Sequence, residues 1–251
     1  MMKKFAWMIG LLCIFLSHAS MTYAKKEVVI HFKNDQIAIS FLKLSNGEAT
    51  LIQEAHQTTL INTGAKSSRN ELFNWLDRYG VKKLDALIIT RAGRLYTGNK
   101  DILLKKYHIK QYIAPRAISK SQTFTELKKI GKLKINVINE RYEGANLLLS
   151  YGSENIYFLS IPHKWTNKKT PQANIIKIDH FGLKSRLDST WIKHLDPEMV
   201  VIFKKKGYRA SPELCHQLQS NFIDLYLLNE TGTVLVLLSP NDYQVHSIPD
   251  N

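Results

Sequence analysis

The stretch LDALIITRAGRLYTGN, from Leu84 to Asn99, decides the fold of this chain. It opens with a mostly apolar run, which predicts a buried β-strand over Leu84–Thr90. After Thr90 the sequence becomes polar and contains glycine, so we expect a loop at the end of the strand. Arg91 and Arg94 lie on this loop, and arginine side chains bind phosphate and carboxylate groups through paired hydrogen bonds. The first candidate site therefore lies at the carboxyl end of this strand.

The rest of the chain alternates short apolar runs with segments of helical spacing. Strands are expected at Val28–Phe32, Ile37–Leu44, Ala49–Gln53, Thr58–Asn62, Gln111–Ala114, Lys134–Ile138, Asn146–Tyr151, Asn155–Ile161, Ala173–Asp179, Met199–Phe203, Asp224–Leu228 and Thr233–Ser239. Helices are expected at Glu71–Tyr79, Asp101–Tyr107, Thr125–Lys132, Asp188–His194 and Pro212–Gln219. No linker or low-complexity tract divides the chain. The sequence thus predicts one α/β or α+β domain over residues 25–251, with sheets at the centre and helices outside.

Residues 1–24 have the pattern of a signal peptide. Lys3 and Lys4 precede an apolar segment, Phe5–Leu16, and Thr22–Ala24 forms a small-residue cleavage site. The alternative is a retained membrane anchor, but the apolar segment is shorter than the roughly 20 residues that a membrane span needs. We therefore expect a secreted or cell-envelope protein with no stable membrane span after cleavage.

The charge of the chain favours anionic partners. The net charge is +14, and removal of residues 1–24, with two lysines and no acidic residue, leaves +12. Nucleic acid, wall polymers and acidic lipid headgroups all fit such a charge, while the alternative is a basic surface that is merely solvated. Cys13 lies in the predicted signal peptide, so only Cys215 remains and neither an intrachain disulfide nor a cysteine-based zinc site is expected.

Seven segments lie along the chain in a recognisable order: FLKLSNGEA at Phe41–Ala49, TLINTG at Thr59–Gly64, KKLDALIITRAGRLYTG at Lys82–Gly98, Leu103–Pro115, KIDHFGL at Lys177–Leu183, Pro197–Ile202 and Asn229–Val236. This order resembles the metallo-β-lactamase-fold hydrolases, and among them the extracellular domain of ComEC-type competence DNA-uptake proteins. The resemblance covers nearly the whole mature chain, from about Val28 to Ser239. It implies a metallo-β-lactamase-like αββα sandwich.

The resemblance also implies a metal-ligand loop H-x-H-x-D-H directly after Thr90. In this chain the four ligand positions are Arg91, Gly93, Leu95 and Tyr96. The remaining ligand and acidic positions of the family are changed as well, to Lys43, Asn62, Ser160–Pro162, Phe181, Arg209 and Ser211.

Among these positions, only His180 still carries the histidine that the family has there. A catalytic zinc needs about three protein ligands and an open position. We therefore expect no catalytic residue of the family type, no metal site and no zinc cofactor. The alternative is a metal site rebuilt around His180 and His163.

The residues that remain favour anion binding. The candidate anion-binding residues lie on loops that the fold would bring together, and they are Arg91, Arg94, Lys184, Arg186 and Arg209, with Lys204–Lys206 just before the last of them. The alternative is that each cation simply faces water. Aromatic residues lie near the same loops and would either stack on nucleic-acid bases or fill the emptied metal cavity; they are Tyr96, Trp165, Phe181 and Tyr208.

Three functional hypotheses follow from these residues. The first is a non-enzymatic binder of an anionic polymer or ligand at the cell envelope, with nucleic acid foremost. The second is a divergent metal-dependent hydrolase of nuclease or phosphodiesterase type that retains His180 as a ligand. The third is a scaffold for another envelope protein. Salt separates the first from the third, because binding to phosphates weakens steeply with ionic strength.

Overall fold

The computed structural model describes residues 27–30, 33, 35–119, 124, 127–162, 172–183 and 190–250. The predicted signal peptide lies outside the described residues, and so do His163, Trp165, Lys184 and Arg186. Within the described part of the chain, no helix is both long and apolar enough to cross a membrane.

The first sheet has the strand order β14-β13-β1-β2-β3-β4-β5. Its strands are β1 (Ile37–Phe41), β2 (Thr50–Gln53), β3 (Thr58–Ile61), β4 (Ala86–Ile88), β5 (Gln111–Ile113), β13 (Thr233–Ser239) and β14 (Asp242–Ile248). Neighbouring strands from β14 to β3 are antiparallel, whereas β3, β4 and β5 are parallel. Parallel neighbours need a crossover, and here α2 (Arg69–Arg78) lies between β3 and β4, and α3 (Arg94–Thr97) and α4 (Lys100–Tyr107) between β4 and β5.

The second sheet has the order β12-β11-β10-β9-β8-β7-β6. Its strands are β6 (Lys129–Ile130), β7 (Leu133–Arg141), β8 (Gly144–Tyr151), β9 (Glu154–Phe158), β10 (Ile175–Lys177), β11 (Met199–Ile202) and β12 (Asp224–Leu227). The half from β6 to β9 is antiparallel, and the half from β9 to β12 is parallel. The helices of this half are α5 (Thr190–Leu195) and α6 (Pro212–Ser220), and α7 (Leu228–Thr231) leads back to the first sheet.

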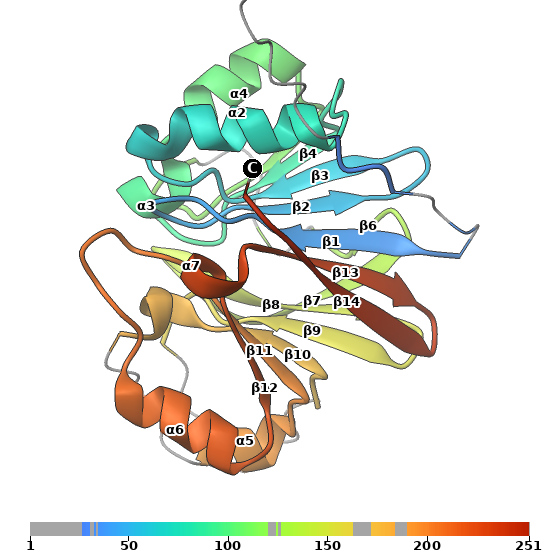
Figure 1. The fold of residues 1–251 in the computed structure, drawn as a ribbon. Helices are drawn as coiled ribbons and strands as arrows, with labels where there is room; N and C mark the ends of the chain where they lie inside the picture. The colour runs from blue at the N-terminus through green and yellow to red at the C-terminus, as the bar shows by residue number, and fades with distance from the viewer. Residues whose placement is uncertain are drawn as a thin grey trace, which may run out of the picture.

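The two sheets face each other, with α2 and α4 outside the first sheet and α5 and α6 outside the second (Figure 1). Three apolar clusters fill the spaces between these layers. Side chains of a strand alternate between the two faces of its sheet, so Ile88 of β4 enters the central cluster while Leu87 packs under α2. In the same way Ile175 of β10 enters the central cluster while Ile176 packs under α5. The predicted αββα sandwich is confirmed.

Some predicted elements differ from the structure. The helix expected at Thr125–Lys132 is wrong in its described part, because Lys129 and Ile130 form β6 and pair with β7. Gly131 makes this two-residue hairpin turn with a φ of +53°, a conformation that glycine adopts without strain. The chain at 27–30 is not a strand. Several elements were not predicted, among them the one-turn helices α3 and α7 and the edge strand β14.

Candidate functional site

The candidate site lies where strands of both sheets end on the same edge of the sandwich. Asn62 follows β3, Thr90 follows β4 and Ser160 follows β9. The backbone N–H of Thr90 donates to Asn62 Oδ1 at 2.9 Å, and Ser160 Oγ donates to Thr90 Oγ1 at 2.9 Å. All three residues are buried, so these hydrogen bonds satisfy polar groups that water does not reach. They form a polar floor that joins the two sheets beneath the loops of the site.

A glycine lets the hairpin between β7 and β8 approach this floor. Ala145 N donates to Thr90 O at 2.9 Å, and Gly144 forms an isolated β-bridge with Arg91. A Cβ atom at Gly144 would lie 2.6 Å from Thr90 O and 2.8 Å from the Ile161 side chain. Because such distances are too short for carbon atoms, only glycine fits without a shift of the neighbouring chain.

A buried ion pair lies next to the floor. Lys177, the last residue of β10, donates from Nζ to Glu48 Oε2 at 2.8 Å, and each side chain is 1% exposed. The same ammonium group donates to Leu159 O at 3.0 Å and to Ser160 Oγ at 3.2 Å. A charge buried so completely is tolerated only when it is paired and hydrogen-bonded. The sequence analysis did not single out this pair, although a lysine within the apolar run of Ala173–Asp179 was an available signal.

The structure brings Arg91 and His180 together, as the motif order predicts. Arg91 Nη1 donates to Ser160 O at 2.9 Å, and its two terminal nitrogens lie 3.1 Å from His180 Nδ1 and 2.9 Å from His180 Nε2. A guanidinium group only donates hydrogen bonds, so the ring accepts through the nitrogen that carries no proton. His180 has a left-handed backbone, with a φ of 49°, and its side chain is exposed.

Two aromatic residues lie under this contact. The Tyr96 ring is 5.6 Å from the carbon of the Arg91 guanidinium, and it stacks on Phe181 with 6.1 Å between ring centres. Both aromatic side chains are at most 5% exposed. They therefore fill space between the loops and present no open face to a nucleic-acid base.

The other cations sit on neighbouring exposed segments. Arg94 begins α3 and is exposed. Arg209 is exposed on the loop that precedes α6, and this loop returns to the turn of His180 because Ser211 N donates to Gly182 O at 2.9 Å. Tyr208 on the same loop is 57% exposed, and Lys205 Nζ lies 3.8 Å from the centre of its ring. We call the surface formed by residues 91–97, 180–183 and 205–211 the mouth.

Gly47 and Glu48 bind one mouth segment and the residue directly before another. Glu48 N donates to Leu95 O at 3.0 Å, and Gly47 N donates to Lys204 O at 3.1 Å. The mouth segments carry Arg91, Arg94, Lys205, Lys206 and Arg209, and their sequence contains no aspartate or glutamate. The mouth is thus a cationic surface built on rigid strand ends.

The described side chains do not fit a metal centre. Within the described ranges there is no group of three or more histidine, cysteine, aspartate or glutamate side chains that could hold a metal ion. The imidazole of His180 faces Arg91, and a guanidinium is not a metal ligand. His163, the other histidine of the rebuilt-site alternative, lies outside the described residues.

Comparison with known proteins agrees with this architecture. No family model matches the chain. The chain is 21% identical to ComE operon protein 3 of Bacillus subtilis (strain 168) in an alignment 253 positions long, which covers 78% of this chain and 32% of that protein. It therefore spans about a third of the length of the curated relative it matches.

Among solved structures, the metallo-β-lactamase fold protein YhfI of Bacillus subtilis superposes with a TM-score of 0.56 and 10% identity, over 84% of this chain and 100% of that protein. A diphosphatase of the PhnP family superposes with a TM-score of 0.51 and 13% identity, over 81% of this chain and 98% of that protein. The chain has the metallo-β-lactamase fold. The match to ComE operon protein 3 agrees with the resemblance to ComEC-type proteins.

Proposed function

We propose that this protein is a non-catalytic binding protein that acts outside the cytoplasm, at the cell envelope, and holds an anionic polymer on its mouth. Nucleic acid is the first candidate. The observation that carries the proposal is the place of Arg91. It stands where the fold family has the first metal ligand, it is hydrogen-bonded to the floor through Ser160 O, and it faces His180, the one family ligand that this chain keeps.

The electrostatics of the mouth support an anionic ligand. Its five lysine and arginine residues are not balanced by any carboxylate within the same segments. Clustered cations on exposed loops attract phosphate groups, and each phosphate that they neutralise releases counterions. Arg94, Lys206 and Arg209 are exposed and so reach a ligand from the surface.

Tyr208 favours a polymer with unpaired bases over a simple polyanion. Its ring is exposed, and Lys205 lies against the ring. Single-stranded nucleic acids bind by stacking bases on aromatic rings that lie beside basic residues. The resemblance to competence DNA-uptake proteins points to the same class of ligand. We therefore expect single-stranded DNA to bind more tightly than a wall polymer of similar charge.

Binding of a fluorescein-labelled oligonucleotide, followed by fluorescence anisotropy, tests this proposal. We expect the affinity for single-stranded DNA to fall steeply with salt, and each phosphate contact to contribute about 0.7 to the slope of log K against log salt. Arg94→Ala and Arg209→Ala should each weaken binding and lower the slope. Tyr208→Ala should weaken binding and leave the slope unchanged.

Lys134→Ala is the matched control, because Lys134 is an exposed cation at the start of β7, at the other end of that strand from the mouth. Affinity that does not depend on salt, or equal losses in the control and in the mouth variants, would refute the proposal. A scaffold for another envelope protein would instead leave the oligonucleotide unbound, which would also refute the proposal.

A further inference from the structure

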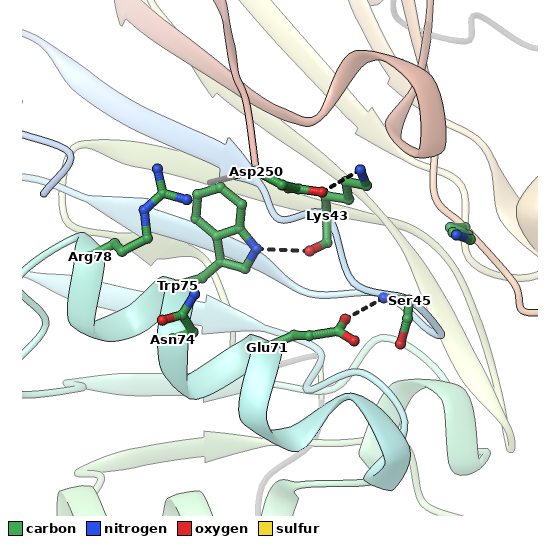
Figure 2. A pocket seen from close by; sticks show the side chains of 8 residues that line it. Lys43, Ser45, Glu71, Asn74, Trp75, Arg78 and Asp250 are labelled. Atoms are coloured by element: carbon green, nitrogen blue, oxygen red, sulfur yellow. Dashed lines mark hydrogen bonds and ion pairs between the residues drawn. The ribbon is translucent and has the colours of Figure 1, made fainter. Parts of the chain in front are cut away.

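A separate pocket lies between α2 and the loop that follows β1 (Figure 2). Its volume is about 380 Å³, within the usual range for small-molecule sites. It is lined by Lys43, Ser45, Glu71, Asn74, Trp75, Arg78, Lys204 and Asp250. Lys204 lies just before the candidate anion-binding residue Arg209 in the sequence, and the other lining residues are not among those candidates.

Buried side chains of α2 form the floor of the pocket. Trp75 Nε1 donates to Lys43 O at 2.8 Å, and the guanidinium carbon of Arg78 lies 4.3 Å from the centre of the Trp75 ring. Trp75 and Arg78 are at most 5% exposed. Glu71 accepts a hydrogen bond from Ser45 N, so one rim carboxylate is already committed to the backbone.

The chain supplies its own anion to this pocket. Asp250 follows β14, which ends at Ile248, and its carboxylate forms an ion pair with Lys43, which points toward it in Figure 2. The Asp250 side chain is 48% exposed and that of Lys43 is 23% exposed. Such an accessible pair contributes little to stability, because water and salt screen it. The Asp250 carboxylate can therefore be displaced without unfolding the sheet behind it.

The charges of the lining residues indicate which kind of ligand would replace the Asp250 carboxylate. Lys43, Arg78 and Lys204 are cations, and Glu71 and Asp250 are carboxylates. Without the Asp250 carboxylate the lining keeps three cations against one anion. An external anion could therefore pair with the ammonium group of Lys43 in place of the Asp250 carboxylate. The rest of the pocket would hold the uncharged part of the ligand.

We infer that this pocket is a second anion-binding site, that Asp250 occupies it as an internal competitor, and that its external ligand is a small organic molecule with a carboxylate or phosphate group that binds to Lys43. The pocket adjoins the mouth at Lys204 but shares no residue with it, and the inference does not depend on the proposed function. Citrate and glycerol 3-phosphate serve as probes, because both are small molecules and they carry carboxylate and phosphate groups, respectively.

The indole N–H of Trp75 is the reporter, because it donates to the backbone carbonyl of Lys43 at the floor of the pocket. Its ¹H–¹⁵N signal, assigned with Trp75→Phe, should shift when either probe is titrated. Because an exposed ion pair is weak, Asp250→Asn should tighten binding by about threefold to fivefold. Adding Lys43→Ala to this variant should weaken binding at least about tenfold, since it removes the charged partner of the ligand.

Asp242→Asn is the control for charge, because Asp242 is an exposed acid at the start of β14 and does not line the pocket. It should bind as the unchanged protein does. Thermal unfolding of each variant checks that the fold is intact, and Lys204→Ala provides a second pocket variant if Lys43→Ala does not fold. A shift with only one probe identifies the anionic group that the pocket prefers.

The inference is overturned if neither probe shifts the Trp75 signal in Asp250→Asn, or if binding is the same with and without Lys43. Arg94→Ala and Arg209→Ala should leave the titration unchanged. Loss of DNA binding in those variants and loss of probe binding in Lys43→Ala are thus separate results, and either hypothesis can fail alone.

Discussion

Replacement of Lys177 by methionine should destabilise the protein more than any exposed substitution. Lys177 Nζ donates to Glu48 Oε2, Leu159 O and Ser160 Oγ, at distances from 2.8 to 3.2 Å. Methionine keeps the length of the side chain but removes the ammonium group. The Glu48 carboxylate, 1% exposed, then loses its cationic partner in a place that water does not reach.

The magnitude follows from the cost of an unpaired buried charge. Removing one partner of a buried ion pair costs about 3–5 kcal/mol, a large part of a total stability of about 5–15 kcal/mol. For a chain of this size such a loss lowers the melting temperature by about 6–20 °C. Glu48→Leu should cost a similar amount, because it leaves the ammonium group of Lys177 without its carboxylate.

The double variant Glu48→Leu/Lys177→Met separates charge from packing. An apolar pair of similar volume often replaces a buried ion pair at little cost, so the double variant should recover most of the loss in each single variant. Urea unfolding followed by circular dichroism measures the four free energies of the cycle. Losses below about 1 kcal/mol in the single variants, or additive losses in the double variant, would refute the reasoning, because they would mean that the buried charges are not coupled.

Three further predictions test other parts of the structure. Gly144→Ala should cost about 1–3 kcal/mol, since the new Cβ would lie 2.6 Å from Thr90 O, and an unchanged urea midpoint would contradict this contact. Burial raises the pKa of Tyr79 to about 12. Because the unfolded chain releases the tyrosine proton near pH 10, stability should fall as the pH rises from 10 to 12, by up to about 3 kcal/mol, and Tyr79→Phe should remove that part of the decline. Elemental mass spectrometry of protein purified without chelator or affinity tag should find substoichiometric zinc, manganese and iron, and a stoichiometric metal that is lost in His180→Ala would support the hydrolase alternative instead.

The fold was predictable because its determinants are local and repeat along the chain. The apolar run before Arg91 forms β4, and the order of the later segments placed His180 on the same edge of the sandwich. The prediction of a helix around Lys129 was wrong for a reason that is also local. Apolar spacing cannot distinguish a helix from a tight hairpin whose turn depends on Gly131. The strand β14 was missed because it is an edge strand with exposed polar residues and little apolar content.

The contacts of the candidate site were only partly predictable. The motif order brought Arg91, Ser160 and His180 to one place, but it did not show that the guanidinium would contact the imidazole. The ion pair of Glu48 and Lys177 joins residues 129 positions apart, and no spacing rule connects them. Pairs of this kind depend on how two sheets face each other, and this is settled only when the whole sandwich is assembled.

Two cations at this edge of the sandwich, Lys177 and Arg91, fix the loops that follow the strands. Lys177 and Arg91 both bind the chain that follows β9, where Lys177 donates to Leu159 O and Arg91 donates to Ser160 O. Each cation also faces a residue on another segment, Glu48 for Lys177 and His180 for Arg91. Strand ends of both sheets are thus joined by ammonium and guanidinium hydrogen bonds, and charged donors make stronger hydrogen bonds than neutral ones. Because Lys177 and Arg91 are engaged in these contacts, we expect the exposed cations of the mouth, Arg94 and Arg209 among them, to make the main contacts with a ligand.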